Sequence, residues 1–489
     1  MQPQKTAKEA HPSRRPQNTP AATALPGPLG TALSPKQLLN QFRKLLPARM
    51  LATWLALVPQ GFYQRAFTPR ITLWYLIFQR LSPDHTLDKA LSDALAGGAD
   101  ALSPRGKRLS CQLRSQATTS LSNARQGLPL LVTYEALKHA TQQIRSWVQD
   151  PLWHDWSVVL LDGSTVRLRP YGDIPEQFPP HRPGNCQSPY WCLMRVVVGF
   201  CLSTGGVVDC AMGSAKLSEQ ALTAQLFSGG AWAKRLLVAD RNFGVYSVVR
   251  AAQAVSAQML VRLTQVRARK LARDAKVRLR AGLDALVSWK PSAWDQCPKG
   301  LAPESVAGRL LAIRVQRPGF RPLLLYLFTT LTDIQAYSAA HLAQLYGQRW
   351  QVELNLRFVK TQMDLGALEC KSADMARKEW LAGLIAYNLI RSVMVAAAAL
   401  AQIPVLVLSF SRTRHLFQDW LVRWAWRPAA NPKAWEQLLD RVAGRRHPRR
   451  RKPRPPEPRA IRYFKQDFPK LVGERAAARK QLELANAKS

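Results

Sequence analysis

Two aspartates occupy positions at which a carboxylate is rigidly held and still reachable. Asp162 directly follows the apolar stretch 157–161, and Asp240 directly follows the apolar stretch 235–239. Both stretches have the length and the β-branched composition of buried strands, so each carboxylate is expected at the exposed end of a strand. Taken alone, either residue is more often a turn or helix-cap residue than a ligand.

A third acid lies in the segment 345–363, whose polar and apolar residues separate when the segment is wound as a helix. At about 100° per residue, Tyr346, Arg349, Glu353 and Lys360 fall on one face of that helix. The simpler alternative is an ordinary amphipathic helix with an Arg–Glu pair four residues apart. The two aspartates upstream favour the chemical interpretation.

Three carboxylates in one cleft would repel one another and raise their own pKa values unless a cation neutralised them. Oxygen-only ligands suit Mg²⁺ or Mn²⁺ rather than zinc. Two such ions about 4 Å apart would activate a water or a 3′-hydroxyl for in-line displacement at a phosphodiester. The sequence therefore predicts a two-ion site at Asp162, Asp240 and Glu353, with Asp155 and Asp209 as weaker alternatives to Asp162.

The net charge agrees with a polyanionic substrate. The chain has 70 Lys and Arg against 31 Asp and Glu, which leaves +39. Because each basic side chain that neutralises a phosphate releases counterions, such a surface suits DNA, RNA or an anionic membrane, and charge alone does not choose among them. Basic runs at 105–125 and 445–459 are expected to contact DNA, with a solubilising tail as the alternative for the second, and the stretch 262–280 is also unusually basic.

Cysteine usage and apolar segments indicate a cytoplasmic protein with no membrane contact. The seven cysteines include no CxxC pair, so neither a disulfide framework nor a thiolate zinc site is expected. The N-terminus has no apolar run that resembles a signal peptide. The apolar segment 392–410 is interrupted by Gln402 and Pro404, so we expect a buried helix and then a break.

The elements that must position the acids form an α/β pattern. Strands at 157–161, 194–202, 206–212 and 235–239 are expected, with helices at 218–227 and 245–255. A β-rich stretch with strands at 258–263, 310–316 and 322–331 follows, and then a helical block from 339 to 400. Strands mixed with helices in this way predict an α/β or α+β core.

The flanks differ from this core, and 489 residues are enough for two or more domains. Residues 1–33 have the composition of a flexible tail, and 34–150 are predicted to form a helical N-terminal domain that can bind DNA. Residues 401–444 are predicted to be a C-terminal helical region, and 445–489 a basic tail.

The polar face of the segment 345–363 resembles the signature of the DDE transposases of bacterial insertion sequences, in the type-four insertion-sequence group. In that signature Tyr, Arg, Glu and Lys are separated by two, three and six residues, as they are at Tyr346, Arg349, Glu353 and Lys360. The resemblance covers about residues 156–400. It implies a ribonuclease-H-like catalytic core from 151–257 and 334–400, interrupted by a β-rich insertion at 258–333.

The resemblance also implies a reaction and a set of roles. The activity would be metal-dependent cleavage at the terminal inverted repeats of a transposon and strand transfer into target DNA, by a homodimer in a bacterial nucleoid. Asp162, Asp240 and Glu353 would hold two Mg²⁺ or Mn²⁺ ions. The side chains expected to bind DNA are Tyr346, Arg349, Lys360, Arg357, Trp289 and Trp294.

The two tryptophans enter this set for a specific reason. In relatives the excised end passes through a DNA hairpin, and an aromatic residue of the insertion stacks on a flipped base. Trp289 and Trp294 lie in the stretch that fits the insertion. The alternative, that both only pack the insertion's small core, is at least as strong.

Three other functions remain open at the level of sequence. A non-catalytic relative that only binds DNA would keep the basic surface, although all of the signature residues are intact here. Another metal nuclease of the same fold, such as a resolvase, would cut branched DNA without inverted repeats. A basic RNA-associated protein is the third, but no single-stranded RNA-binding motif is visible.

Overall fold

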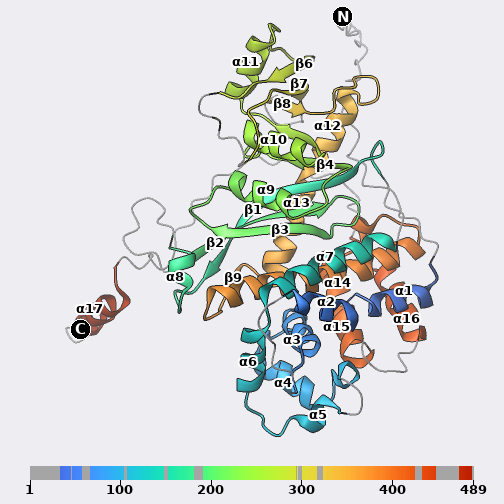
Figure 1. Ribbon diagram of the computed structural model, residues 1–489, viewed down its shortest axis with the longest axis vertical. Helices are drawn as coiled ribbons and strands as arrows, with labels where there is room; N and C mark the ends of the chain where they lie inside the picture. Colours follow the sequence, from blue (N-terminus) through green and yellow to red (C-terminus); the bar gives the residue numbers. More distant parts are fainter. Residues whose placement is uncertain are drawn as a thin grey trace, which may run out of the picture.

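One nine-stranded sheet crosses the molecule and carries helices on both faces, which makes the fold mixed α/β (Figure 1). The computed structural model describes residues 33–45, 47–57, 66–103, 107–147, 152–180, 191–292, 295, 300–316, 323–424, 432–447 and 473–486. Of the predicted tail 1–33, the structure describes residue 33 alone. Of the predicted tail 445–489, it describes residues 445–447 and 473–486.

Five strands form the centre of the sheet in the order β3-β2-β1-β4-β5. Their bounds are β1 (Ser157–Leu168), β2 (Cys192–Cys201), β3 (Val207–Ser214), β4 (Arg235–Ala239) and β5 (Gln258–Arg262). β2 is antiparallel to β1 and β3, whereas β4 is parallel to both β1 and β5. Parallel pairing is expected for strands this apolar, because helices cover both of their faces.

The predicted β-rich stretch continues the same sheet. β5 pairs antiparallel with β8 (Leu323–Thr329), which is followed by β7 (Val306–Val315) and β6 (Asp284–Trp289). β6 was not predicted. The short strand β9 (Ala367–Leu368) pairs with β1 outside this order. The boundaries of the insertion stay predictions, since its strands are hydrogen-bonded to the central ones.

The basic run after β5 contains a helix, α11 (Gln265–Asp274), where the sequence predicted only β-rich structure. Thr264 caps the helix by accepting a hydrogen bond from the N–H of Arg267. Ala268, Leu271 and Ala272 recur at helical spacing and are buried. The many charges hid this narrow apolar stripe, so no helix was predicted for the segment.

Two helical layers cover the sheet. Val159 and Leu161 of β1 face α9 (Glu219–Ser228) and α10 (Tyr246–Ala254), in one apolar cluster. Val158 and Leu160 point the other way, as alternation along a strand requires, and join the cluster that contains α14 (Ala373–Leu400). Even-numbered residues at the start of β1 therefore point toward α14, and odd-numbered residues point toward α9 and α10.

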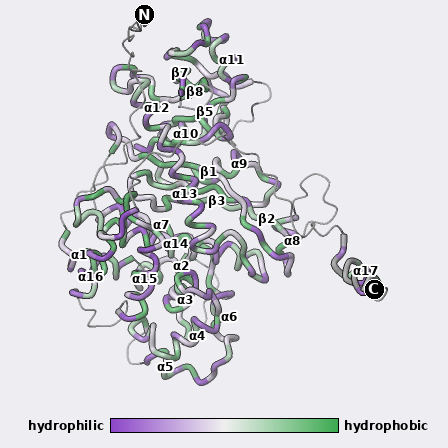
Figure 2. The backbone as a smooth tube through the Cα atoms, turned by 180° about the vertical axis from the view of Figure 1, so that it is seen from behind, coloured by the Kyte–Doolittle hydropathy of each residue, from purple (hydrophilic) through white to green (hydrophobic). Residues whose placement is uncertain are grey.

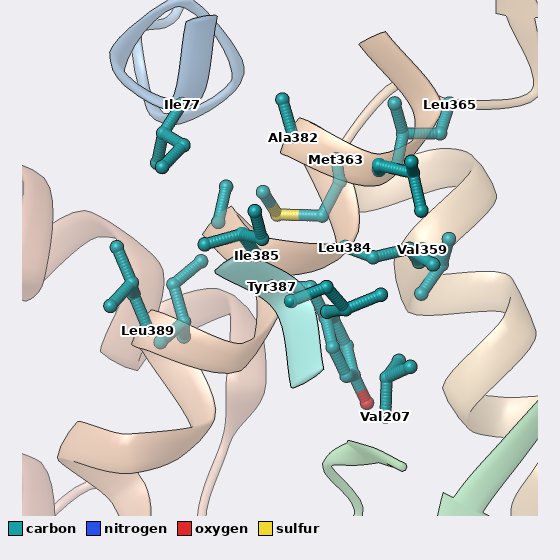
Figure 3. Packing of buried hydrophobic residues seen from close by; sticks show 14 of the residues in the cluster. Ile77, Val207, Val359, Met363, Leu365, Ala382, Leu384, Ile385, Tyr387 and Leu389 are labelled. Atoms are coloured by element: carbon teal, nitrogen blue, oxygen red, sulfur yellow. The ribbon is translucent and has the colours of Figure 1, made fainter. Parts of the chain in front are cut away.

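The helix α14 (Ala373–Leu400) is the centre of the larger helical layer. It is long and apolar enough to cross a membrane, but all of its most apolar stretch is buried inside the fold. Figure 3 shows Leu384, Ile385 and Tyr387 of α14 packed near Ile77 of α3 (Pro69–Leu81) and near Val359 and Met363 of the signature segment. As predicted, this buried helix ends before Gln402 and Pro404.

The N-terminal and C-terminal helices pack around α14 at one end of the molecule, away from α11 and β6–β8 (Figure 1). They share one continuous apolar core with a face of the sheet. These helices are α1 (Pro35–Arg43), α2 (Ala48–Ala56), α3 (Pro69–Leu81), α4 (Leu87–Leu95), α5 (Leu109–Gln112), α6 (Thr119–Gly127), α7 (Leu130–Ser146), α15 (Phe410–Trp424) and α16 (Pro432–Ala443). Two further helices, α8 (Ile174–Gln177) and α17 (Arg475–Asn486), complete the order.

The predicted signature helix is a chain of four helical pieces. It comprises the end of α12 (Ala339–Gly347), a 3₁₀ turn Gln348–Trp350, α13 (Gln351–Arg357) and a π-helix Phe358–Gln362. Apolar residues of α13 and the π-helix, Val352 and Val359, are fully buried. Short π-helices inside α-helices are frequent at functional sites.

Candidate active site

The two predicted aspartates lie side by side at the carboxyl end of a parallel strand pair. β1 pairs with β4 from Ser157↔Arg235 to Leu160↔Val238. Two more residues in this register bring Asp162 beside Asp240, on strands that are about 4.8 Å apart. Asp240 directly follows β4, as predicted.

The predicted end of the first strand was wrong. β1 continues through Asp162 to Leu168, because β2 pairs with it from Val159↔Cys201 to Leu168↔Cys192. Only the parallel partner β4 ends here, so Asp162 projects from the middle of a strand rather than from its end. On one side, the backbone of Asp162 is paired with Val198 of β2. On the other side, the β4 ladder has already ended, and Asp240 follows it.

The environment of Asp162 works against its negative charge. Burial raises the pKa of Asp162 to about 6, and the nearby carboxylates of Asp240 and Glu219 add to the rise. The N–H of Gly163 donates to Asp162 Oδ1 at 2.8 Å, and Arg349 also lowers the pKa. Asp240 Oδ1 accepts a hydrogen bond from the N–H of Asn242 at 2.8 Å. The two acids are thus held by neighbouring backbone amides.

The signature segment brings three of its four polar residues to these strands. Arg349 is close enough to Asp162 to affect its pKa, and Tyr346 is affected by Asp240. Burial is the main cause that raises the pKa of Tyr346 to about 12. Lys360 Nζ donates to Ser164 Oγ on β1 at 3.1 Å. Burial, followed by Arg167, lowers the pKa of Lys360.

Glu353 is placed differently. Its carboxylate accepts a hydrogen bond from Arg349 at 2.7 Å, and its side chain is 61% exposed. Among the residues that the structure describes, no three His, Cys, Asp or Glu side chains are arranged to hold a metal ion. The structure therefore brings Asp162 and Asp240 together and keeps Glu353 one ion pair away. Arg357, also in α13, is exposed.

The chemistry of the donor set fits a divalent cation at the aspartate pair. Asp162 and Asp240 present only oxygen atoms, which suits Mg²⁺ or Mn²⁺. Their mutual repulsion contributes to the raised pKa of Asp162, and a cation between them would remove it. Glu353, whose Oε1 accepts from Arg349, does not complete a three-ligand site with them in the part of the chain that the structure describes.

The two weaker acidic alternatives lie elsewhere. Asp209 is 4% exposed and accepts a hydrogen bond from the hydroxyl of Tyr134 at 3.1 Å. Its pKa is raised, mainly by burial. Asp155 lies in the turn before β1, with a φ of 67°. Neither contacts the aspartate pair in any bond described for it.

The structure favours the packing alternative for one tryptophan. Trp289 is 6% exposed, and its ring meets that of Phe328 edge to face, with centroids 4.9 Å apart. It is a core residue of the region around β6 and β8, and stacking on a base would require it to leave that core. Trp294 lies outside the described residues.

Three polar residues beside the acids were not predicted as part of the site: Ser164, Glu219 and Asn242. Ser164 binds Lys360, and Glu219 Oε2 accepts a hydrogen bond from Asn242 Nδ2 at 2.5 Å. A signal for Glu219 was present, because Ser218 and Glu219 form a typical N-terminal start for the helix that follows the hairpin. Only the fold shows that this start lies against β1.

Comparison with known proteins agrees with this geometry. Residues 153–389 match the family model of the transposase DDE domain, a range that contains both aspartates and the whole signature segment. The chain is 24% identical over 343 residues to transposase InsG for insertion sequence element IS4 of Escherichia coli strain K12. That alignment covers 68% of this chain and 72% of the relative.

Among solved structures, the chain is similar to the piggyBac transposase in its synaptic complex with hairpin DNA, studied by cryo-electron microscopy. The match has a TM-score of 0.40 and 11% sequence identity, and it covers 85% of this chain and 87% of the other.

Enzymes with the DDE domain act as nucleases and transesterases on phosphodiesters, and the family generally uses divalent metal ions. The signature spacing and the paired aspartates lie inside the matched range, and the similarity to the insertion-sequence relative extends beyond it. The chain therefore belongs to the DDE transposases of the type-four insertion-sequence family.

Proposed function

We propose that this transposase cuts DNA at the terminal inverted repeats of its element and joins the ends to target DNA, with Asp162, Asp240 and Glu353 as the metal-binding residues. The observation that carries the proposal is the register that brings Asp162 beside Asp240 at the end of β4. The strand order β3-β2-β1-β4-β5, with only β2 antiparallel to β1, supports a ribonuclease-H-like core. Such a core presents its acids at this edge.

Two Mg²⁺ or Mn²⁺ ions are the proposed cofactors. When bound, divalent cations supply Lewis-acid stabilisation for in-line displacement at phosphorus. Asp162 and Asp240 would hold them first, because these two carboxylates are already adjacent and supported by the N–H groups of Gly163 and Asn242. Glu353 would complete the ligand set from α13.

Arg349 explains how the third acid can be absent from the site before DNA binds. It now bonds Glu353, and it also lies near Asp162. A DNA phosphate can accept two parallel hydrogen bonds from arginine, as a carboxylate does. We infer that Arg349 exchanges Glu353 for a phosphate when the transposon end enters, which frees Glu353 for the metal site.

The remaining signature residues would bind the DNA backbone near the cut. Tyr346 and Lys360 flank the acids, and exposed Arg357 extends this surface. Trp294 and, after rearrangement, Trp289 remain proposed platforms for a flipped base. The partners are double-stranded transposon ends and target DNA, and a homodimer would hold the two ends together.

The decisive experiment is a cleavage assay. Purified protein with Mg²⁺ should cut DNA that carries the terminal inverted repeats, and Asp162→Ala, Asp240→Ala and Glu353→Ala should each abolish cutting while binding persists. Glu436→Ala, at an exposed position on α16, is the matched control and should cut normally. Cutting by any of the three variants at the wild-type rate would reject that residue's role. Binding without cutting by the wild type would indicate a non-catalytic relative.

A further inference from the structure

We propose that Glu219 is a positioning residue for the two catalytic aspartates, which it holds indirectly through Asn242 and Gly163. The inference rests on the proposed roles of Asp162 and Asp240. Glu219 is the first residue of α9, a helix that follows the β2–β3 hairpin and packs on the face of the sheet opposite α14. No motif of the signature includes it.

The first contact leads to Asp240. Glu219 Oε2 accepts a hydrogen bond from Asn242 Nδ2 at 2.5 Å, and the N–H of Asn242 donates to Asp240 Oδ1 at 2.8 Å. Gln220 supports the same turn, because its Nε2 donates to the carbonyl and to Oδ1 of Asn242, both at 2.8 Å. The start of α9 thus fixes the loop that aims the second aspartate.

The second contact leads to Asp162. A Cβ atom on Gly163 would lie 2.2 Å from Glu219 Cδ and 2.3 Å from its Oε1, so the carboxylate of Glu219 rests directly on this glycine. The N–H of Gly163 donates to Asp162 Oδ1 at 2.8 Å. Any other residue at 163 would displace Glu219. One side chain therefore touches both residues whose amides hold the aspartates.

Strand alternation separates Glu219 from the reacting side. Side chains alternate between the two faces of β1. Asp162 therefore lies on the same face as Val158 and Leu160, which is covered by the layer of α14. Gly163 lies on the opposite face, with Val159 and Leu161, which is covered by α9. Glu219 accordingly contacts β1 from the α9 face, whereas the side chain of Asp162 projects from the α14 face. Its role is to fix their separation, as outer residues of metal sites fix the ligands.

Conservative and disruptive variants test this role. Glu219→Gln keeps an oxygen that can accept the hydrogen bond from Asn242 Nδ2. Glu219→Ala and Asn242→Ala each remove this hydrogen bond, which is called the 219–242 link. We would measure the Mg²⁺ concentration for half-maximal cleavage, and Mn²⁺ binding without DNA by electron paramagnetic resonance. DNA affinity and thermal midpoint serve as measures of fold, and Glu436→Ala is again the control.

Loss of the link should raise the half-saturating Mg²⁺ and weaken Mn²⁺ binding by about 10- to 100-fold. Glu219→Gln should stay near wild type, and the double variant should be no worse than Glu219→Ala, because both changes remove one link. The inference is overturned if the two alanine substitutions weaken metal binding additively in the double variant. It is also overturned if Glu219→Gln weakens metal binding as much as Glu219→Ala, or if both alanine variants keep the wild-type metal dependence. Should Glu219→Ala fail to fold, Asn242→Ala alone decides.

Failure of this inference can be told apart from failure of the proposed site. If Asp162→Ala and Asp240→Ala leave metal binding and cleavage intact, the catalytic assignment itself is wrong. If those variants lose both while the alanine variants at 219 and 242 behave as wild type, only the positioning role is rejected.

Discussion

At the scale of single residues, the carboxyl group of Asp162 lies in surroundings that disfavour its negative charge. Its ordinary pKa of 3.8 rises to about 6 in the folded chain, mainly through burial. The folded state therefore binds this proton more tightly than the unfolded state. Stability contributed by the protonated acid is present below about pH 4, is lost as pH rises to about 6, and stays lost above that pH.

Asp162→Asn should consequently stabilise the metal-free protein at pH 8 while it abolishes cleavage. The amide keeps an acceptor for the N–H of Gly163 but carries no charge beside Asp240. We expect a gain of about 1–3 kcal/mol in the free energy of unfolding, because a two-unit pKa shift sets the upper limit. Urea unfolding at pH 8 and pH 4 measures it. An equal gain at both pH values would contradict the electrostatic cause.

At the scale of elements, a buried arginine joins α13 to α14. Arg391 is 2% exposed, its Nη2 donates to Asn355 Oδ1 of α13 at 2.8 Å, and its Nε donates to the hydroxyl of Tyr387 at 2.8 Å. Its guanidinium also lies over the rings of Phe358 and Phe410. This contact fixes α13 two residues from Glu353.

Arg391→Lys should loosen this junction. An ammonium cannot bond Asn355 and Tyr387 together while it stacks on flat rings, since only guanidinium has that planar fork. We expect a loss of about 1–3 kcal/mol in unfolding free energy and a fall in cleavage greater than the fall in DNA binding. Calorimetry and the cleavage assay check this. Arg423→Lys, at an exposed position on α15, is the control.

At the scale of the whole molecule, one acid ties the N-terminal helices to the core. Glu379 of α14 pairs with Arg80 of α3 and, at 2.6 Å, with Arg125 of α6. Burial alone would raise the pKa of Glu379, but the two arginines lower it below its usual value. Its contribution to stability is therefore present above the ordinary Glu range and is lost as pH falls through the lowered pKa.

Glu379→Gln should release this junction, because it leaves two nearly buried guanidinium groups without a counter-charge. A loss of about 3–5 kcal/mol in unfolding free energy is expected. Limited proteolysis should then cut first between the N-terminal helices and the sheet. Glu369→Gln, on a largely exposed carboxylate paired with Arg169, should lose far less. Equal losses in the two variants would contradict the role of burial.

The distribution of charge is also a property of the whole molecule. Hydrophilic colour marks much of the tube near α11 in Figure 2. Arg269 and Arg273 of this helix, and Lys276 just after it, are exposed. Asp274 is the one acid of that helix. If this surface binds DNA, replacing Arg269 and Lys276 with Ala should reduce the slope of log affinity against log salt by about 2. Fluorescence anisotropy across a salt series measures this slope, and an unchanged slope would contradict contact at α11.

Much of the fold and of the site could be predicted from local pattern. The bounds of β4, the position of Asp240 behind it and the helix after the hairpin depend on neighbouring residues, because apolar periodicity and capping chemistry act over a few positions. Helical spacing likewise singled out Tyr346, Arg349, Glu353 and Lys360 as candidates, and the resemblance to the family signature supplied their expected roles. The basic segment at α11 was missed because charge dominates its composition, although its apolar spacing is helical.

Only the tertiary structure decided how the acids relate to one another. Asp162 lies within β1 because β2 pairs alongside it, and strand pairing depends on partners far away in the chain. The same long-range contacts bury Trp289, set Arg349 between Asp162 and Glu353, and bring Glu219 behind Gly163. The sequence by itself determined which side chains could do the chemistry, since residue type and local pattern are encoded along the chain. Their distances arose only when the sheet assembled.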